Sequence, residues 1–211
     1  YLVGIHYEEN VMIHIENTHT SDIARLREIR NVAQELRFAA GVAGETMLPL
    51  STIANFLQFL IILFQPRENL GDVFGAMDYT HRTIFIDALE SVGSQRFIIA
   101  HVLGHLFLHS EHQDEPGWIY DYRSSHAHLI DSLREQEADL FALELLMPME
   151  LVRQHMNKNS RNLQDMASEF QVSMEVLQRR LDVINVEAWN AKMCILAKIP
   201  PGEKPKMIDY L

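Results

Sequence analysis

Two histidines lie four residues apart in the stretch Arg96-Phe-Ile-Ile-Ala-His101-Val102-Leu-Gly104-His105-Leu-Phe-Leu-His109. The stretch is mostly apolar and predicts a helix over about residues 95–109. Residues four apart on a helix lie one above the other on the same face, so both imidazoles can bind one metal ion. Gly104 lets a second helix pack closely against this one. The stretch therefore predicts a metal-binding helix.

One position in this stretch departs from H-E-x-x-H, the pattern of zinc metallopeptidases, in which the Glu is the general base. Val102 stands in its place. Valine can neither take a proton from water nor pass one to a leaving amine, and such groups contribute about 10²–10⁴-fold to rate. We therefore expect a metal-binding scaffold with impaired catalysis, and activity as an enzyme stays uncertain. Two alternatives remain open: Val102 is an introduced substitution, or a loop carboxylate (Glu111, Asp114 or Glu115) replaces the base.

The third metal ligand is expected from the segment Glu135-Gln-Glu137-Ala-Asp139. A catalytic zinc usually takes three protein ligands, and two histidines with one glutamate are a known set. Glu135 and Asp139 are four residues apart and share a helix face, whereas Glu137 points elsewhere. We expect Glu135 to join His101 and His105 as a ligand, and Asp139 to accept the spare ring N–H of a ligand histidine. Glu137 is the fallback ligand.

Zinc is the expected ion for such a set, although manganese or iron could occupy the same ligands. Other histidines follow the ligand pair. His109 continues the helix and is expected at the surface or at the helix end, while His126 and His128 are expected in solvent within a polar loop. None of these three is assigned to the metal.

The two motif stretches together resemble the ImmA/IrrE family of bacterial and phage metallopeptidases. Phe97–His109 is similar to the family's R-F-x-x-A-H-E-L-G-H-x-x-L-H helix, and Glu135–Pro148 to its E-x-x-A-N-x-F-A-x-x-L-L-M-P helix. The resemblance covers about residues 25–185. Asp139 stands where the family usually has Asn, and Val102 stands where it has its catalytic Glu.

The resemblance implies a minimal zincin-like fold, in which a small sheet packs on the metal-site helices. By position, His101, His105 and Glu135 match the family's metal ligands. Several members cleave helix-turn-helix repressors and so release stress, phage or mobile-element genes. We therefore expect a regulatory protein with a repressor-like protein partner and with catalysis impaired at Val102. The alternative is an active zinc peptidase that cleaves such a repressor.

The order of the expected elements predicts an α+β fold with a helical C-terminal part. Helices are expected over 21–43, 52–60, 95–109 and 129–146, strands over 60–64, 73–79 and 83–86, and a loop over 110–128. The expected divisions are an N-terminal β-hairpin extension (1–18), a zincin-like core (19–148), a helical segment like a helix-turn-helix (149–186) and an extended Pro-containing tail (187–211).

The spacing of a helix-turn-helix lies within residues 162–181, where Ser173 is expected to cap the second helix. A DNA-reading role would depend on Arg179 and Arg180, which stand between Glu175 and Asp182. A DNA-associated regulator without enzyme activity is therefore a further alternative. The net charge of −11 argues against it, because DNA binding needs a positive surface.

The composition fits a folded globular protein, with 47% hydrophobic residues. The single cysteine, Cys194, excludes an intramolecular disulfide and a cysteine-based zinc site. No window of about 18 apolar residues predicts a membrane span, and the first residues do not resemble a signal peptide. These features lead us to expect a cytoplasmic protein.

Overall fold

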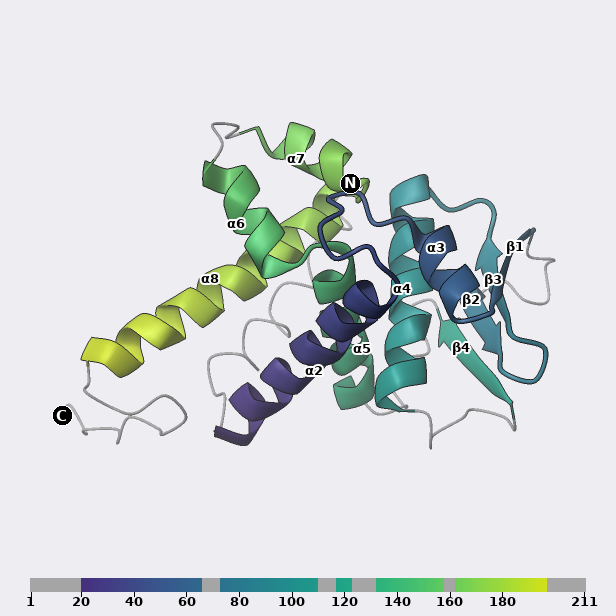
Figure 1. Ribbon diagram of the computed structural model, residues 1–211, viewed down its shortest axis with the longest axis horizontal. Coiled ribbons are helices and arrows are strands. Elements are labelled where there is room, and N and C mark those ends of the chain that lie inside the picture. Colours follow the sequence, from purple (N-terminus) through teal and green to yellow (C-terminus); the bar gives the residue numbers. More distant parts are fainter. Residues whose placement is uncertain (1–19, 66–72, 110–116, 123–131, 158–161, 197–211) are drawn as a thin grey trace, which may run out of the picture.

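The computed structural model describes residues 20–65, 73–109, 117–122, 132–157 and 162–196. The expected hairpin over 1–18 lies outside these ranges, as do His126, His128 and the loop carboxylates Glu111, Asp114 and Glu115. Figure 1 shows a small sheet beside a layer of helices, with a second group of helices from the C-terminal part. The expected α+β class with a helical C-terminal part is confirmed. Within the described ranges, no helix is long and apolar enough to cross a membrane.

Among the described residues, four strands form a mixed sheet in the order β1-β3-β2-β4. β1 (Leu60–Phe64) runs parallel to β3 (Thr83–Asp87), and β2 (Val73–Asp78) runs antiparallel to both β3 and β4 (Trp118–Tyr122). The first three strands are close to the predicted ranges. The loop expected over 110–128 was wrong for residues 118–122, which form a strand of five residues by pairing with β2. Its aromatic residues and isoleucine favour a strand.

The helix with the two histidines, α4 (Val92–Leu108), lies between the sheet and α5 (Ser132–Leu146) (Figure 1). It begins earlier than expected because the Ser91 hydroxyl accepts a hydrogen bond from the Ser94 N–H at 3.2 Å. α2 (Thr20–Ala39) packs against α5 and ends before Gly41, whose φ of 73° does not continue a helix. α3 (Leu50–Phe56) lies against β1 and begins after Pro49.

The backbones of α4 and α5 approach closely at Gly104. A Cβ atom at this glycine would lie 2.9 Å from Ala138 Cα and 3.0 Å from the Ala138 carbonyl oxygen. The two small residues therefore let the helices come closer than larger side chains would allow. This contact positions the metal-ligand candidates of α4 opposite those of α5.

Replacing Gly104 with valine is expected to lower the free energy of unfolding by about 1–3 kcal/mol, because the added side chain would overlap backbone atoms of α5. Urea denaturation of the variant beside the wild type measures the change. Gly44→Val is the matched control, because an added Cβ at Gly44 meets no atom within 4 Å. Equal losses in both variants would contradict the close helix contact as the cause.

The C-terminal part contains α6 (Met149–Asn157), α7 (Leu163–Phe170) and α8 (Met174–Leu196). Ser173 caps α8 as expected, since its hydroxyl accepts a hydrogen bond from the Val176 N–H at 3.2 Å. The extended tail expected from residue 187 was wrong for 187–196, which continue α8. No proline or glycine interrupts the chain between Ser173 and Pro200, so the helix has no local reason to end earlier. Figure 1 shows the far half of α8 projecting beyond the other helices.

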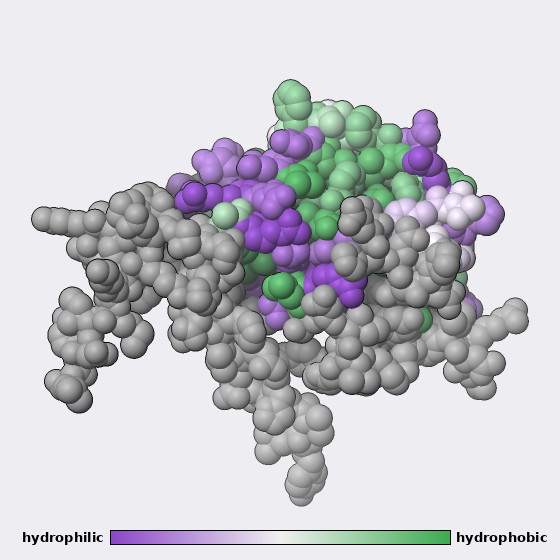
Figure 2. All heavy atoms as spheres, turned by 90° about the horizontal axis from the view of Figure 1, so that it is seen from below, coloured by the Kyte–Doolittle hydropathy of each residue, from purple (hydrophilic) through white to green (hydrophobic). Residues whose placement is uncertain are grey.

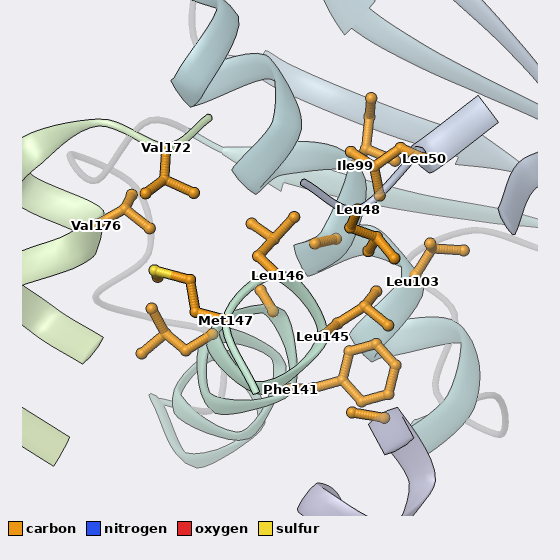
Figure 3. Packing of buried hydrophobic residues seen from close by; sticks show 14 of the residues in the cluster. Leu48, Leu50, Ile99, Leu103, Phe141, Leu145, Leu146, Met147, Val172 and Val176 are labelled. Carbon is orange, nitrogen blue, oxygen red and sulfur yellow. The ribbon is translucent and has the colours of Figure 1, made fainter. Parts of the chain in front are cut away.

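One apolar core joins the sheet, the motif helices and the C-terminal helices. Figure 3 shows Leu146 and Met147, at the end of α5, lying between Leu103 of α4 on one side and Val172 and Val176 on the other. The zincin-like core was expected to end at residue 148. Buried residues before and after this position belong to the same apolar cluster.

A buried charged network also links α2, α5 and α8. The Glu144 carboxylate contacts Arg30 Nε through Oε1 at 2.8 Å and Arg180 Nη2 through Oε2 at 2.7 Å. Arg180 is fully buried, and its Nε donates a hydrogen bond to the Met147 carbonyl at 2.8 Å. One carboxylate of α5 therefore holds arginines from two helices that are far apart in the sequence.

Candidate metal centre

Three potential metal ligands converge where α4 faces the first turn of α5. His101 and His105 are buried, and their Nε2 atoms lie 3.0 Å apart. Glu135 places Oε2 3.2 Å from His101 Nε2 and Oε1 3.4 Å from His105 Nε2. Each of the three residues offers one ligand atom, and these atoms lie within 4.8 Å of one another. The structure thus brings together the three residues that the sequence analysis expected as metal ligands.

The separations match what a small tetrahedral ion requires. Two ligand atoms at about 2.0–2.2 Å from a tetrahedral ion lie roughly 3.3–3.5 Å apart. The three separations in this cluster, 3.0, 3.2 and 3.4 Å, fall within a few tenths of an ångström of that range. Two imidazole nitrogens and one carboxylate are also a usual donor set for zinc. The residues present therefore fit a metal ion.

The ring of His101 is oriented by Asp139 from one helical turn beyond Glu135. His101 Nδ1–H donates to Asp139 Oδ1 at 2.9 Å, and its Nε2 points towards Glu135 and His105. Arg179 of α8 donates to the other oxygen of Asp139, and its guanidinium lies 5.3 Å from the ring centre of Phe97. A residue of the C-terminal helices thus takes part in the surroundings of the site.

The ring of His105 has a different neighbour, His109. His105 Nδ1 lies 3.2 Å from His109 Nδ1, and His109 Nε2–H donates to Glu137 Oε2 at 2.8 Å. Glu137 in turn binds Arg25 of α2 through two hydrogen bonds of 2.8 Å. Of the two places expected for His109, the helix end is confirmed, since it is the C-cap residue of α4, and the surface is wrong, since only 5% of its side chain is exposed. Glu137 lies outside the three-ligand cluster, so its fallback role as a ligand gains no geometric support.

The acidic side chains of the site are held in their ionised form. Burial alone would raise the pKa of Glu135, but hydrogen bonds from His101 and His105 bring it below its ordinary value. Burial also opposes the charge of Asp139, whose pKa is nevertheless lowered by the hydrogen bond from His101 and by the charge of Arg179. Both groups therefore carry negative charge at neutral pH, as a cation site needs.

In the outer pair, the pKa values of Glu137 and His109 are both lowered. The hydrogen bond from Arg25 lowers the pKa of Glu137, and burial lowers the pKa of His109. A neutral His109 beside a charged Glu137 is the resulting state at neutral pH.

Val102 directly follows His101 and is completely buried within the apolar core. Its side chain presents only carbon to its surroundings. The position next to the ligand pair therefore offers no atom that can accept a proton.

The sequence of residues 58–182 matches the IrrE N-terminal-like domain, which is a peptidase family. The match covers more than half of the chain and contains α4, α5 and all three residues of the cluster. The chain belongs to the IrrE N-terminal-like peptidase family. The match begins at residue 58, later than the resemblance over about residues 25–185 suggested. No curated protein matches the sequence.

Two contacts of this IrrE N-terminal-like domain come from outside the two motif stretches. Arg25 belongs to α2, before the matched residues, whereas Arg179 belongs to α8 and lies inside them. Sequence reasoning did not connect either arginine with the site. For His109, the spacing of four residues after His105 was a usable signal, because it places a third ring on the same helix face.

Proposed function

We propose that this chain is a metal-binding, regulatory member of the IrrE N-terminal-like family that captures a protein partner and cleaves it slowly or not at all. One observation carries the proposal: the ligand set of His101, His105 and Glu135 is complete, while the adjacent position 102 holds a buried valine. Zinc is the ion we propose, because two histidines and a carboxylate suit it; manganese and iron share these ligands.

Different residues of the site would serve metal binding and peptide hydrolysis. A bound zinc ion would polarise a water molecule and lower its pKa. The protein would hold the ion through His101, His105 and Glu135, and Val102 would leave the usual proton transfer without its acceptor. The nearby carboxylates of Glu137 and Asp139 already face His109 and His101. We therefore expect a site that keeps its affinity for metal and loses most of its hydrolytic rate.

A protein partner is supported by charge and by exposed apolar surface. The net charge of −11 complements the basic DNA-reading surface of a helix-turn-helix repressor. Figure 2 shows apolar surface on the face seen from below, beside strongly hydrophilic regions. Phe107 and Leu133, each two residues from a ligand in the sequence, are 38% and 62% exposed. Contiguous apolar surface, as in Figure 2, favours contact with another protein.

Metal content is the first test of this proposal. The purified chain is expected to contain about one zinc ion per molecule, because three ligands of suitable type and spacing converge. Elemental mass spectrometry measures the content, and His101→Ala/His105→Ala is expected to lose it. His155→Ala removes a partly buried histidine outside the cluster and serves as the control. Failure of the wild type to take up zinc, even when zinc is supplied, would end the metal-binding part of the proposal.

An active zinc peptidase is the second candidate, and membership in a peptidase family favours it. It requires Val102 to be an introduced substitution or another group to act as the base. The DNA-associated alternative gains no support from the described structure, because Arg180 is fully buried against Glu144 and Arg179 pairs with Asp139. These are the two arginines on which a DNA-reading surface would depend.

A further inference from the structure

The carboxylate of Asp139 contacts two different helices at once. Its Oδ1 accepts a hydrogen bond from His101 Nδ1 of α4 at 2.9 Å, and its Oδ2 accepts one from Arg179 Nη2 of α8. Asp139 itself belongs to α5, so three helices meet at this side chain. One carboxylate thus joins a candidate metal ligand to the C-terminal helices.

The guanidinium of Arg179 is placed by a second contact besides Asp139. Its Cζ lies over the Phe97 ring, 5.3 Å from the ring centre, and this ring lies 6.2 Å from the ring of His101. A guanidinium can stack on an aromatic face while its N–H groups donate to a carboxylate, which the ammonium of a lysine does less well. Arg179 therefore contacts both motif helices beside the candidate metal ligand.

The next residue of α8 anchors the helix to α5. Arg180 is fully buried, contacts the Glu144 carboxylate at 2.7 Å and donates to the Met147 carbonyl at 2.8 Å. Consecutive side chains of an α-helix point about 100° apart, so the two arginines leave α8 in different directions. Arg180 can thus hold α8 at the end of α5 while Arg179 reaches Asp139.

The ion pair of Arg179 with Asp139 is not placed where it could contribute much to folding. The Arg179 side chain is 34% exposed and that of Asp139 is 28% exposed, whereas Arg180 and Glu144 are almost completely buried. Ion pairs that water reaches contribute little to stability. The position of Arg179 is better explained by what Asp139 contacts on its other side, the ring of His101.

We propose that Arg179 is a positioning residue of the metal centre, which fixes the Asp139 carboxylate and through it the orientation of the His101 ring. The inference rests on the metal binding proposed above. Outer partners of a metal ligand orient it and strengthen metal binding, and a carboxylate held at its second oxygen is less free to turn away from the histidine. The C-terminal helices thereby support the metal centre although none of the three candidate ligands lies on them.

Zinc affinity of the full 211-residue chain, measured by competition with a coloured chelator, tests this role. Loss of an outer partner of a metal ligand typically weakens metal binding about 10–100-fold. Arg179 lies one contact further out than Asp139, so we expect Arg179→Ala to weaken zinc binding about tenfold, at the low end of that range. Arg179→Lys keeps the positive charge and is expected to restore part of the loss. Arg153→Ala is the matched control: it removes an arginine from an exposed pair with Glu150, and its affinity is expected to stay within about twofold of the wild type.

A double-variant cycle distinguishes positioning from a general weakening of the structure. Asp139→Ala alone is expected to weaken zinc binding about 10–100-fold. Adding Arg179→Ala to it is expected to change the affinity by less than about twofold, because the carboxylate that Arg179 holds is already gone. A general weakening would instead multiply the two losses. Thermal melting followed by circular dichroism shows that each variant is folded at the assay temperature.

The outcomes separate the positioning role from the metal function. Zinc uptake by the wild type with unchanged affinity in Arg179→Ala, or multiplied losses in the double variant, would overturn the positioning role and leave the proposed metal binding in place. A wild type that takes up no zinc would overturn the metal binding, and the role of Arg179 with it. Arg179→Gln, which removes the charge and keeps much of the side-chain length, replaces Arg179→Ala if the alanine variant does not fold.

Discussion

Val102→Glu is expected to raise metal-dependent peptide hydrolysis by about 10²–10⁴-fold over the wild type, the usual contribution of a general acid–base group. The glutamate would follow His101 on α4, in the position that the H-E-x-x-H pattern gives to the base. Because Val102 is completely buried, the new carboxylate also has to be accommodated in an apolar surrounding, and the variant is expected to be less stable than the wild type.

The measurement uses zinc-loaded protein with a quenched fluorescent casein and with candidate helix-turn-helix repressors. Val102→Gln is the control, since glutamine has nearly the size of glutamate and cannot act as a base. A gain in Val102→Glu alone would support the view that the missing base limits the wild type. Fast, chelator-sensitive cleavage by the wild type itself would contradict impaired catalysis and favour the active peptidase.

Glu144→Gln is expected to lower the free energy of unfolding by about 3–5 kcal/mol, because it removes the negative charge that contacts the fully buried Arg180. The contact of the same carboxylate with Arg30 would lose its charge as well. Denaturation with urea, followed by circular dichroism, measures the change. Glu150→Gln is the matched control: it breaks an exposed pair with Arg153, 3.9 Å long, and exposed pairs contribute about 0–1 kcal/mol.

A loss in Glu144→Gln as small as that in the control would show that the buried network contributes little to stability. The same comparison tests how strongly α8 is held, since Arg180 joins it to α5 both at Glu144 and at the Met147 carbonyl.

The parts of the fold that local patterns determine could be predicted from the sequence. The apolar runs of β1, β2 and β3 and the motif helix α4 lie close to their expected ranges. β4 was missed because the polar residues on either side of it indicated a loop, although its aromatic residues and isoleucine favour a strand and it pairs with β2. The end of α8 was placed too early because the tail was interpreted from its prolines, which begin only at Pro200.

The candidate site shows the same division between local and distant contacts. Spacing of four residues on a helix was enough to nominate His101 with His105 and Glu135 with Asp139. The spacing could not show that Glu137 binds Arg25, which is 112 residues away, or that Arg179 of α8 contacts Asp139. Both arginines are paired by the folding of helices onto α5, and no spacing along the chain encodes such a pairing.

The close approach of α4 and α5 at Gly104 also bears on which ions the site admits. His101 and His105 come from one of these helices and Glu135 from the other, so the space between them widens only if the helices separate. Calcium takes six to eight oxygen ligands at about 2.3–2.6 Å, more and longer bonds than two nitrogens and one carboxylate at these separations supply. Glycine and alanine at one helix crossing thereby limit the size of an ion that this candidate site could hold, and small ions that prefer nitrogen ligands fit it best.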